Sequence, residues 1–142
     1  MKCRIILELL AILFFTGCYN REQISRLDEA EALIQNKPDS ALTILQQLKS
    51  EGSQAEQARY ALLYSEALDK NHIKATNDSL IRRAWEYYKH HPKDLRRQCK
   101  TLYYWGKVKL RAGDKPGALR LYLKVEEKLK AVSYTHLRAH ET

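Results

Sequence analysis

Glycine and proline are scarce in this sequence, with 5 and 3 residues among 142. Leucine, alanine, lysine, glutamate and glutamine are plentiful instead, and straight side chains of this kind lose little rotamer freedom in a helix. No stretch of useful length alternates apolar and polar residues, as a half-buried strand would. We therefore expect an all-α fold, in a chain long enough for one domain with a modest core.

Cysteine is also rare, and its spacing excludes the usual structural uses. Cys3, Cys18 and Cys99 form no CxxC pair and have no histidine at ligand spacing, which argues against both zinc and a disulfide framework. The chain also lacks a nucleophile elbow, a glycine-rich phosphate loop and an HExxH pattern. We expect no enzyme activity, no metal and no cofactor.

The only long apolar run lies at the N-terminus. Lys2 and Arg4 precede a mostly apolar stretch from Ile5 to Phe15, interrupted by Glu8. This layout is typical of an export signal, and the stretch is too short to span a bilayer as a helix. Residues 1–17 are therefore interpreted as a signal peptide that is removed.

The end of this run, Phe15-Thr16-Gly17-Cys18, resembles a bacterial lipobox. The resemblance implies that Cys18 is acylated, becomes the new N-terminus and anchors the exported protein in the cell envelope. Several acyl chains would hold it stably, whereas a single chain is marginal. An ordinary cleaved signal with a chance cysteine is the alternative. After cleavage Cys99 is the only free thiol, and residues 18–26 are expected to be a linker.

Helical periodicity with regular breaks extends over residues 27–131. The breaks are Pro38, Gly52, the polar stretch from Asn71 to Asn77, Pro92 and the pair Gly113-Asp114. Six helices in three hairpins are predicted. Asp39 or Ser40 is the expected N-cap of the second helix.

An internal repeat relates the later hairpins. Ala84 and Tyr88 recur 34 residues later as Ala118 and Tyr122. A small residue at Gly106 would let a partner helix approach, and Gly113 would permit a tight turn. The fullest set of such positions lies in the last hairpin: Leu102, Trp105, Gly106, Gly113, Ala118 and Tyr122.

This set resembles the tetratricopeptide repeat, although Lys109 stands where the family usually has an aromatic residue. The segments KPDSALTIL and DSLIRRAWEYY are also similar to repeat lipoproteins from Bacteroidetes. The resemblance implies a short solenoid of about three stacked hairpins that binds a protein or peptide. The alternative is the extracytoplasmic sensing part of a longer membrane-bound regulator.

Positive charge is concentrated in the second half of the chain. Residues 18–76 carry 7 Lys and Arg against 9 Asp and Glu, a net −2, whereas residues 77–131 carry 15 against 6, a net +9. Lys100, Tyr103, Lys107 and Arg111 share one helix face, which in the repeat family would line the groove. They would suit an acidic ligand through charge-assisted hydrogen bonds. A solvated helix face is the alternative, and export argues against nucleic acid.

The last eleven residues, 132–142, resemble one reading frame of the transposase adaptor used to prepare sequencing libraries. We interpret them as a non-native tail, like other processing scars, so the solenoid is expected to be truncated and the natural chain to continue past Ala131. The helix before this tail, Lys115 to Lys130, has too many apolar positions for one partner helix to bury. Some of its apolar side chains are therefore expected to face water.

Overall fold

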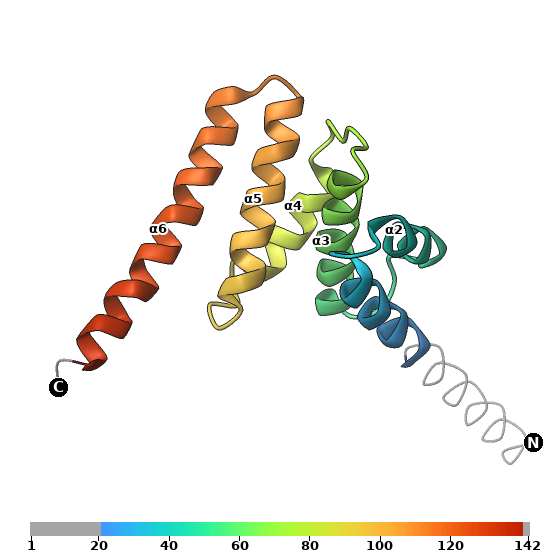
Figure 1. Cartoon of the computed structure of the whole chain (residues 1–142), viewed down its shortest axis with the longest axis horizontal. Coiled ribbons are helices and arrows are strands. Elements are labelled where there is room, and N and C mark those ends of the chain that lie inside the picture. The colour runs from blue at the N-terminus through green and yellow to red at the C-terminus, as the bar shows by residue number, and fades with distance from the viewer. Residues whose placement is uncertain (1–20, 141–142) are drawn as a thin grey trace, which may run out of the picture.

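The computed structural model describes residues 21–140 and the side chains of residues 21–131. This part of the chain contains six helices and no strand, so the predicted all-α class is confirmed. The helices are residues 21–33, α2 (Pro38–Gln47), α3 (Gln54–Lys70), α4 (Ser79–Tyr88), α5 (Leu95–Arg111) and α6 (Lys115–His140). They follow one another along the molecule, with helix 21–33 at one end and α6 at the other (Figure 1).

Proline sets the start of α2. Pro38 is the first helical residue and Lys37 is the N-cap, with no side-chain cap bond. The expected cap at Asp39 or Ser40 is therefore wrong, because proline lacks an N–H and its fixed φ suits the first helical position. Asp39 instead lies in the first turn, where its charge favours the helix dipole.

The other boundaries follow local chemistry. Ser53 and Glu56 form a reciprocal capping box at the start of α3. Gly113 has a φ of +85° between α5 and α6, so the predicted tight turn is present there. The next residue, Asp114, accepts a 2.8 Å hydrogen bond from the N–H of Gly117 and so caps α6.

The helix at the N-terminal end begins earlier than expected. Residues 21–26 were assigned to a linker over 18–26, but they are helical. Gln23 is buried, and its amide donates hydrogen bonds to the backbone oxygens of Lys49 and Glu51 at 3.0 and 2.7 Å. This contact holds the described N-terminal part of the helix against the α2–α3 loop. Residues 18–20, together with residues 1–17, for which a signal peptide is predicted, lie outside the described part.

Two apolar clusters form the core, and both include residues of α3. The first joins helix 21–33, α2 and α3; its most buried members are Leu27, Ala30, Ala41, Leu45 and Ala67. The second joins α3, α4 and α5; it contains Ala58, Ala61, Leu62, Ile81, Ala84, Tyr88 and Tyr104. A central helix that contributes to both clusters couples the two ends of the domain.

The small residues noted in the sequence occupy close approaches. Ala84 and Ala118 are 0% and 2% exposed. A Cβ built on Gly106 would lie 2.4 Å from Cε1 of Tyr122, so only glycine lets this ring lie against α5. Leu102 is completely buried nearby. The α5–α6 hairpin therefore closes through a tyrosine packed on a glycine.

The last helix exposes apolar side chains, as expected. Ala118 and Leu121 are buried, whereas Leu119, Leu123 and Leu129 are 58%, 53% and 54% exposed. The backbone of residues 132–140 continues α6, and the remainder of the tail lies outside the described part. Among the described residues, no helix has the length and apolar character needed to cross a membrane.

Candidate binding face

Four residues of α5 form the stripe indicated by the sequence: Lys100, Tyr103, Lys107 and Arg111. Steps of three and four residues keep them on one side of a 17-residue helix. Tyr103 is 44% exposed, and the ammonium of Lys107 lies 5.7 Å from the centre of its ring. A cation at this distance from a tyrosine face is attracted by the ring electrons. The structure thus brings the four residues together.

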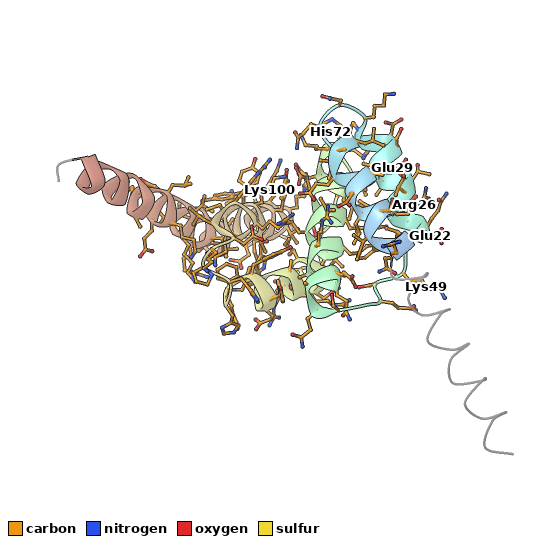
Figure 2. All side chains as sticks on the ribbon, turned by 90° about the horizontal axis from the view of Figure 1, so that it is seen from below. Glu22, Arg26, Glu29, Lys49, His72 and Lys100 are labelled. Carbon is orange, nitrogen blue, oxygen red and sulfur yellow. The ribbon has the colours of Figure 1, made fainter. Side chains whose placement is uncertain are left out.

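The first cation of the stripe is held by a buried carboxylate. Lys100 Nζ lies 2.7 Å from Glu66 Oε2 and 3.0 Å from Oε1. Glu66 is completely buried in α3, and its Oε1 also accepts a 2.9 Å hydrogen bond from the amide of Gln35. Lys100 projects from α5 on the side of α3 (Figure 2).

The other two cations share one carboxylate. Lys107 Nζ lies 2.8 Å from Asp69 Oδ2, and the guanidinium of Arg111 contacts Asp69 Oδ1. The Asp69 side chain is only 11% exposed. Glu66 and Asp69 therefore supply two negative charges against three positive ones, which leaves the stripe with one cation in excess.

Ion pairs extend this surface to the first helix of the domain. Arg59 of α3 pairs with Asp28 and Glu31 of helix 21–33, and Arg97 of α5 lies 3.5 Å from Glu31. Helix 21–33, α3 and α5 are the first helices of the three predicted hairpins, and they therefore line one common face. We call it the first-helix face. Arg59 is held by Asp28 and Glu31, and Arg97 contacts Asp94 as well as Glu31, so at this end three carboxylates face two arginines.

A hollow of about 390 Å³ opens at the end of the first-helix face that carries Arg59 and Arg97. Arg59 and Arg97 line it together with Ile24, Tyr87 and Asp94. The stacking of Tyr87 on the ring of His91, with centroids 3.9 Å apart, fixes its aromatic wall. The face thus combines a cationic stretch on α5 with a concave, partly aromatic end.

The tyrosines near the stripe stay neutral at ordinary pH. Burial raises the pKa of Tyr104 above its usual value of 10, and the charge of Glu66 and a hydrogen bond to it add to this effect. Burial also raises the pKa of Tyr122, with a further contribution from Tyr103 and an opposing one from Lys107. Both phenols therefore remain able to donate hydrogen bonds.

The sequence analysis did not identify Glu66 and Asp69 as partners of the stripe. One signal was available, because Glu66 follows Leu62 by four residues and so interrupts the apolar side of α3. A charged residue at such a position is rarely buried without a partner. The identity of that partner depends on the packing of α5, from which Lys100 comes 34 positions later.

Other site residues noted in the sequence have structural contacts. Trp105 Nε1 donates a 2.9 Å hydrogen bond to Asp78 Oδ2, and Lys109 Nζ lies 3.0 Å from the same oxygen. Lys109 and Trp105 therefore join α5 to the start of α4 through Asp78. Cys18 lies outside the described residues. Among the described residues no group of His, Cys, Asp and Glu could hold a metal ion.

The chain matches no protein-family model, no curated protein and no solved structure.

Proposed function

We propose that this protein is a lipid-anchored helical-repeat module that binds a protein or peptide in the bacterial cell envelope. The observation that carries the proposal is the first-helix face. Ion pairs hold helix 21–33, α3 and α5 side by side. The first helices of the hairpins in a solenoid would be arranged in this way. Such stacks present an extended surface to a partner chain.

Matching lengths support the solenoid arrangement. α3 and α5 each have 17 residues, and their starts at Gln54 and Leu95 are 41 positions apart. The second helices repeat with a spacing of 34, at Ala84 and Ala118 and at Tyr88 and Tyr122. The larger spacing of the first helices reflects the long loop between α3 and α4, residues 71–78.

The chemistry of the α5 stripe favours an acidic partner. Its cations outnumber the carboxylates that hold them, and the exposed ring of Tyr103 adds an aromatic contact. A carboxylate from a partner would form charge-assisted hydrogen bonds with Lys107 and Arg111 without leaving Asp69 unpaired. Attachment through Cys18 would place this surface outside the cytoplasm, beside a membrane.

A peptide-display selection tests this function. Random peptides would be selected on the immobilised protein, and the affinity of the enriched peptides would be measured for two double variants. Lys107→Gln with Arg111→Gln should weaken acidic peptides about tenfold or more, since each charge-assisted bond contributes about 1.5–3 kcal/mol. Arg120→Gln with Lys124→Gln removes the same charge from exposed positions of α6 and should change little.

Thermal melts by circular dichroism would show whether both double variants keep the fold. The proposal is wrong if no peptide is enriched. It is also wrong if the affinity of the enriched peptides is the same for both double variants and independent of salt, because an electrostatic contact at α5 must be screened.

A further inference from the structure

Tyr88 brings a phenol without a protein partner to the hollow of the first-helix face. Its side chain ends α4, is only 3% exposed, and lines the hollow together with Arg59, Asp94 and Arg97. Its backbone oxygen accepts a hydrogen bond from Gln98, but its hydroxyl has no hydrogen-bond partner among the described residues. Every fully buried polar side-chain atom in this part of the chain does have a partner. The Tyr88 hydroxyl must therefore reach solvent, and the hollow is the opening that it lines.

This phenol is neutral at ordinary pH. Burial raises the pKa of Tyr88 to about 12; the charge of Arg97 opposes this shift, whereas those of Asp94 and Glu31 add to it. The hydroxyl therefore lies among the charged groups that surround the hollow. A neutral phenol can donate one hydrogen bond and accept another. Because the described part of the chain uses neither, both remain for a ligand.

The arginines of the hollow also keep unused donors. Arg59 contacts Glu31 and Asp28 through Nε and Nη2, so among the described residues its Nη1 has no partner. Arg97 contacts Asp94 through Nη1 and Glu31 through Nη2, which leaves its Nε without a partner in the same part of the chain. A guanidinium has five N–H donors, and a carboxylate can accept several hydrogen bonds. The hollow therefore offers donors and acceptors side by side.

Charged ligands fit this arrangement poorly. Carboxylates already outnumber the two guanidiniums, and Glu56, which also lines the hollow, adds to the negative charge. An anion would be repelled by this excess. An ammonium carries donors only, so it cannot accept a hydrogen bond from Arg59 or Arg97. A neutral ligand with both donors and acceptors avoids both costs.

The apolar part of the hollow narrows the choice further. Ile24 is 39% exposed there, and Tyr87 contributes a ring that is stacked on His91. Small-molecule sites of about 300–1,000 Å³ typically combine such walls with a few convergent polar groups. A sugar ring has several hydroxyls that both donate and accept, and its C–H groups can pack on an aromatic ring. An amide side chain of a partner protein offers one carbonyl and one NH₂ group, which pair with fewer of the polar groups.

We propose that the hollow beside Tyr88 binds a neutral sugar ring. This inference goes beyond the proposed function and does not depend on it, because the α5 stripe takes no part. The C–H side of the sugar would lie on Tyr87. Its hydroxyls would accept hydrogen bonds from Tyr88 and from the unused N–H groups of the arginines, and would donate to Asp94.

The test compares three neutral sugars with charged sugars of the same ring: glucose, galactose and mannose, each beside its uronate and its protonated 2-amino sugar. Binding to the purified protein would be measured by saturation-transfer NMR and titration. At least one neutral sugar should bind, and its two charged counterparts should bind at least about threefold more weakly, because each meets an unfavourable charge. N-acetylglutamine amide serves as the probe for a protein side chain.

Tyr88→Phe removes the hydroxyl and keeps the ring in the cluster that joins α3, α4 and α5. It should weaken binding of the sugar about threefold to tenfold, because one hydrogen bond to the ligand is lost. It should leave the melting temperature unchanged, since the hydroxyl has no partner among the described residues. Tyr60→Phe is the matched control, because this phenol of α3 is half-buried and does not line the hollow. It should leave sugar binding unchanged.

Four results would overturn the inference. They are no binding of any of the three neutral sugars, tighter binding of a charged counterpart, an affinity that is the same with and without the Tyr88 hydroxyl, and tighter binding of N-acetylglutamine amide than of all three sugars. The last result would assign the hollow to a side chain of a protein partner. None of these results bears on the displayed peptides, whose affinity is expected to depend on Lys107 and Arg111, so the two proposals can fail separately.

Discussion

Lys100 of α5 and Glu66 of α3 form an ion pair that joins these two helices. The ammonium lies 2.7 Å from a carboxylate whose side chain is only 1% exposed, while the lysine side chain is 26% exposed. The carboxylate is thus buried and the cation reaches it from the edge. A buried charge of this kind is tolerated only because it is paired and hydrogen-bonded.

Loss of the lysine should be far more damaging than loss of the pair. Lys100→Met leaves Glu66 with hydrogen bonds from the amide of Gln35 and the hydroxyl of Tyr104 but no cation, and should destabilise the fold by about 3 kcal/mol. Lys100→Met combined with Glu66→Leu should recover most of this loss, because an apolar pair avoids the buried charge. Urea unfolding measures both effects.

Lys89→Met is the matched control, since Lys89 pairs with Glu86 in an exposed i,i+3 contact. Such pairs contribute about 0–1 kcal/mol. If the Lys100 variant is no less stable than this control, the pair with Glu66 is not an important part of the α3–α5 contact.

Gly106 should be intolerant of any side chain while Tyr122 is present. Gly106→Ala places a Cβ about where the Tyr122 ring now lies, so the ring must move. Overpacking of this kind costs about 1–3 kcal/mol, which exceeds the gain of about 1 kcal/mol from replacing glycine in a helix. Thermal melts of Gly106→Ala, Tyr122→Ala and the variant with both changes measure how strongly the two positions are coupled. In a Tyr122→Ala background the same change should be neutral or stabilising, and an equal cost in both backgrounds would contradict the packing argument.

Asp78 should make stability depend on pH in the acid range. Burial tends to raise its pKa, but hydrogen bonds from Lys109 and Trp105 and the charges of Lys109 and Arg82 outweigh this and lower it from 3.8. A carboxylate with a lowered folded pKa stabilises the fold above its unfolded pKa, and this stabilisation is lost as the pH falls through the folded pKa. The contribution is therefore complete above about pH 4 and decreases below it.

Asp78→Asn should remove this part of the pH dependence. The free energy of unfolding of the variant should therefore be lower than that of the unchanged protein above about pH 4, and the difference should shrink below it. Denaturant unfolding at a series of pH values measures it. Trp105→Phe removes the hydrogen bond from the indole N–H to Asp78 and should reduce the pH dependence in part. A pH dependence that is the same in the Asp78→Asn protein would show that another carboxylate is responsible.

Cys18 should be the site of lipid attachment. In a bacterial host the protein should incorporate labelled palmitate and partition into detergent, and Cys18→Ala should abolish both. Cys99→Ala is the matched control, because burial raises the pKa of this thiol and so lowers its reactivity. Labelling that persists in the Cys18 variant would refute the lipoprotein interpretation.

The amino-acid sequence by itself determined where the helices lie and where most of them stop. Apolar residues at helical spacing, Pro38 and Gly113 are local signals, because each acts on the backbone of its own segment. The apolar excess on α6 was likewise visible in the sequence, since Leu119 and Leu129 are additional to the apolar residues that one hairpin partner can bury.

Only the tertiary structure decided how the charges are used. Lys100, Lys107 and Arg111 form a cationic stripe in the sequence, but their carboxylates come from α3, 34 to 42 positions earlier. A local pattern specifies which side of a helix is charged, and it carries no information on which distant helix packs against that side. The number of cations left to attract a partner depends on that packing, because each buried carboxylate neutralises part of the stripe before any ligand arrives.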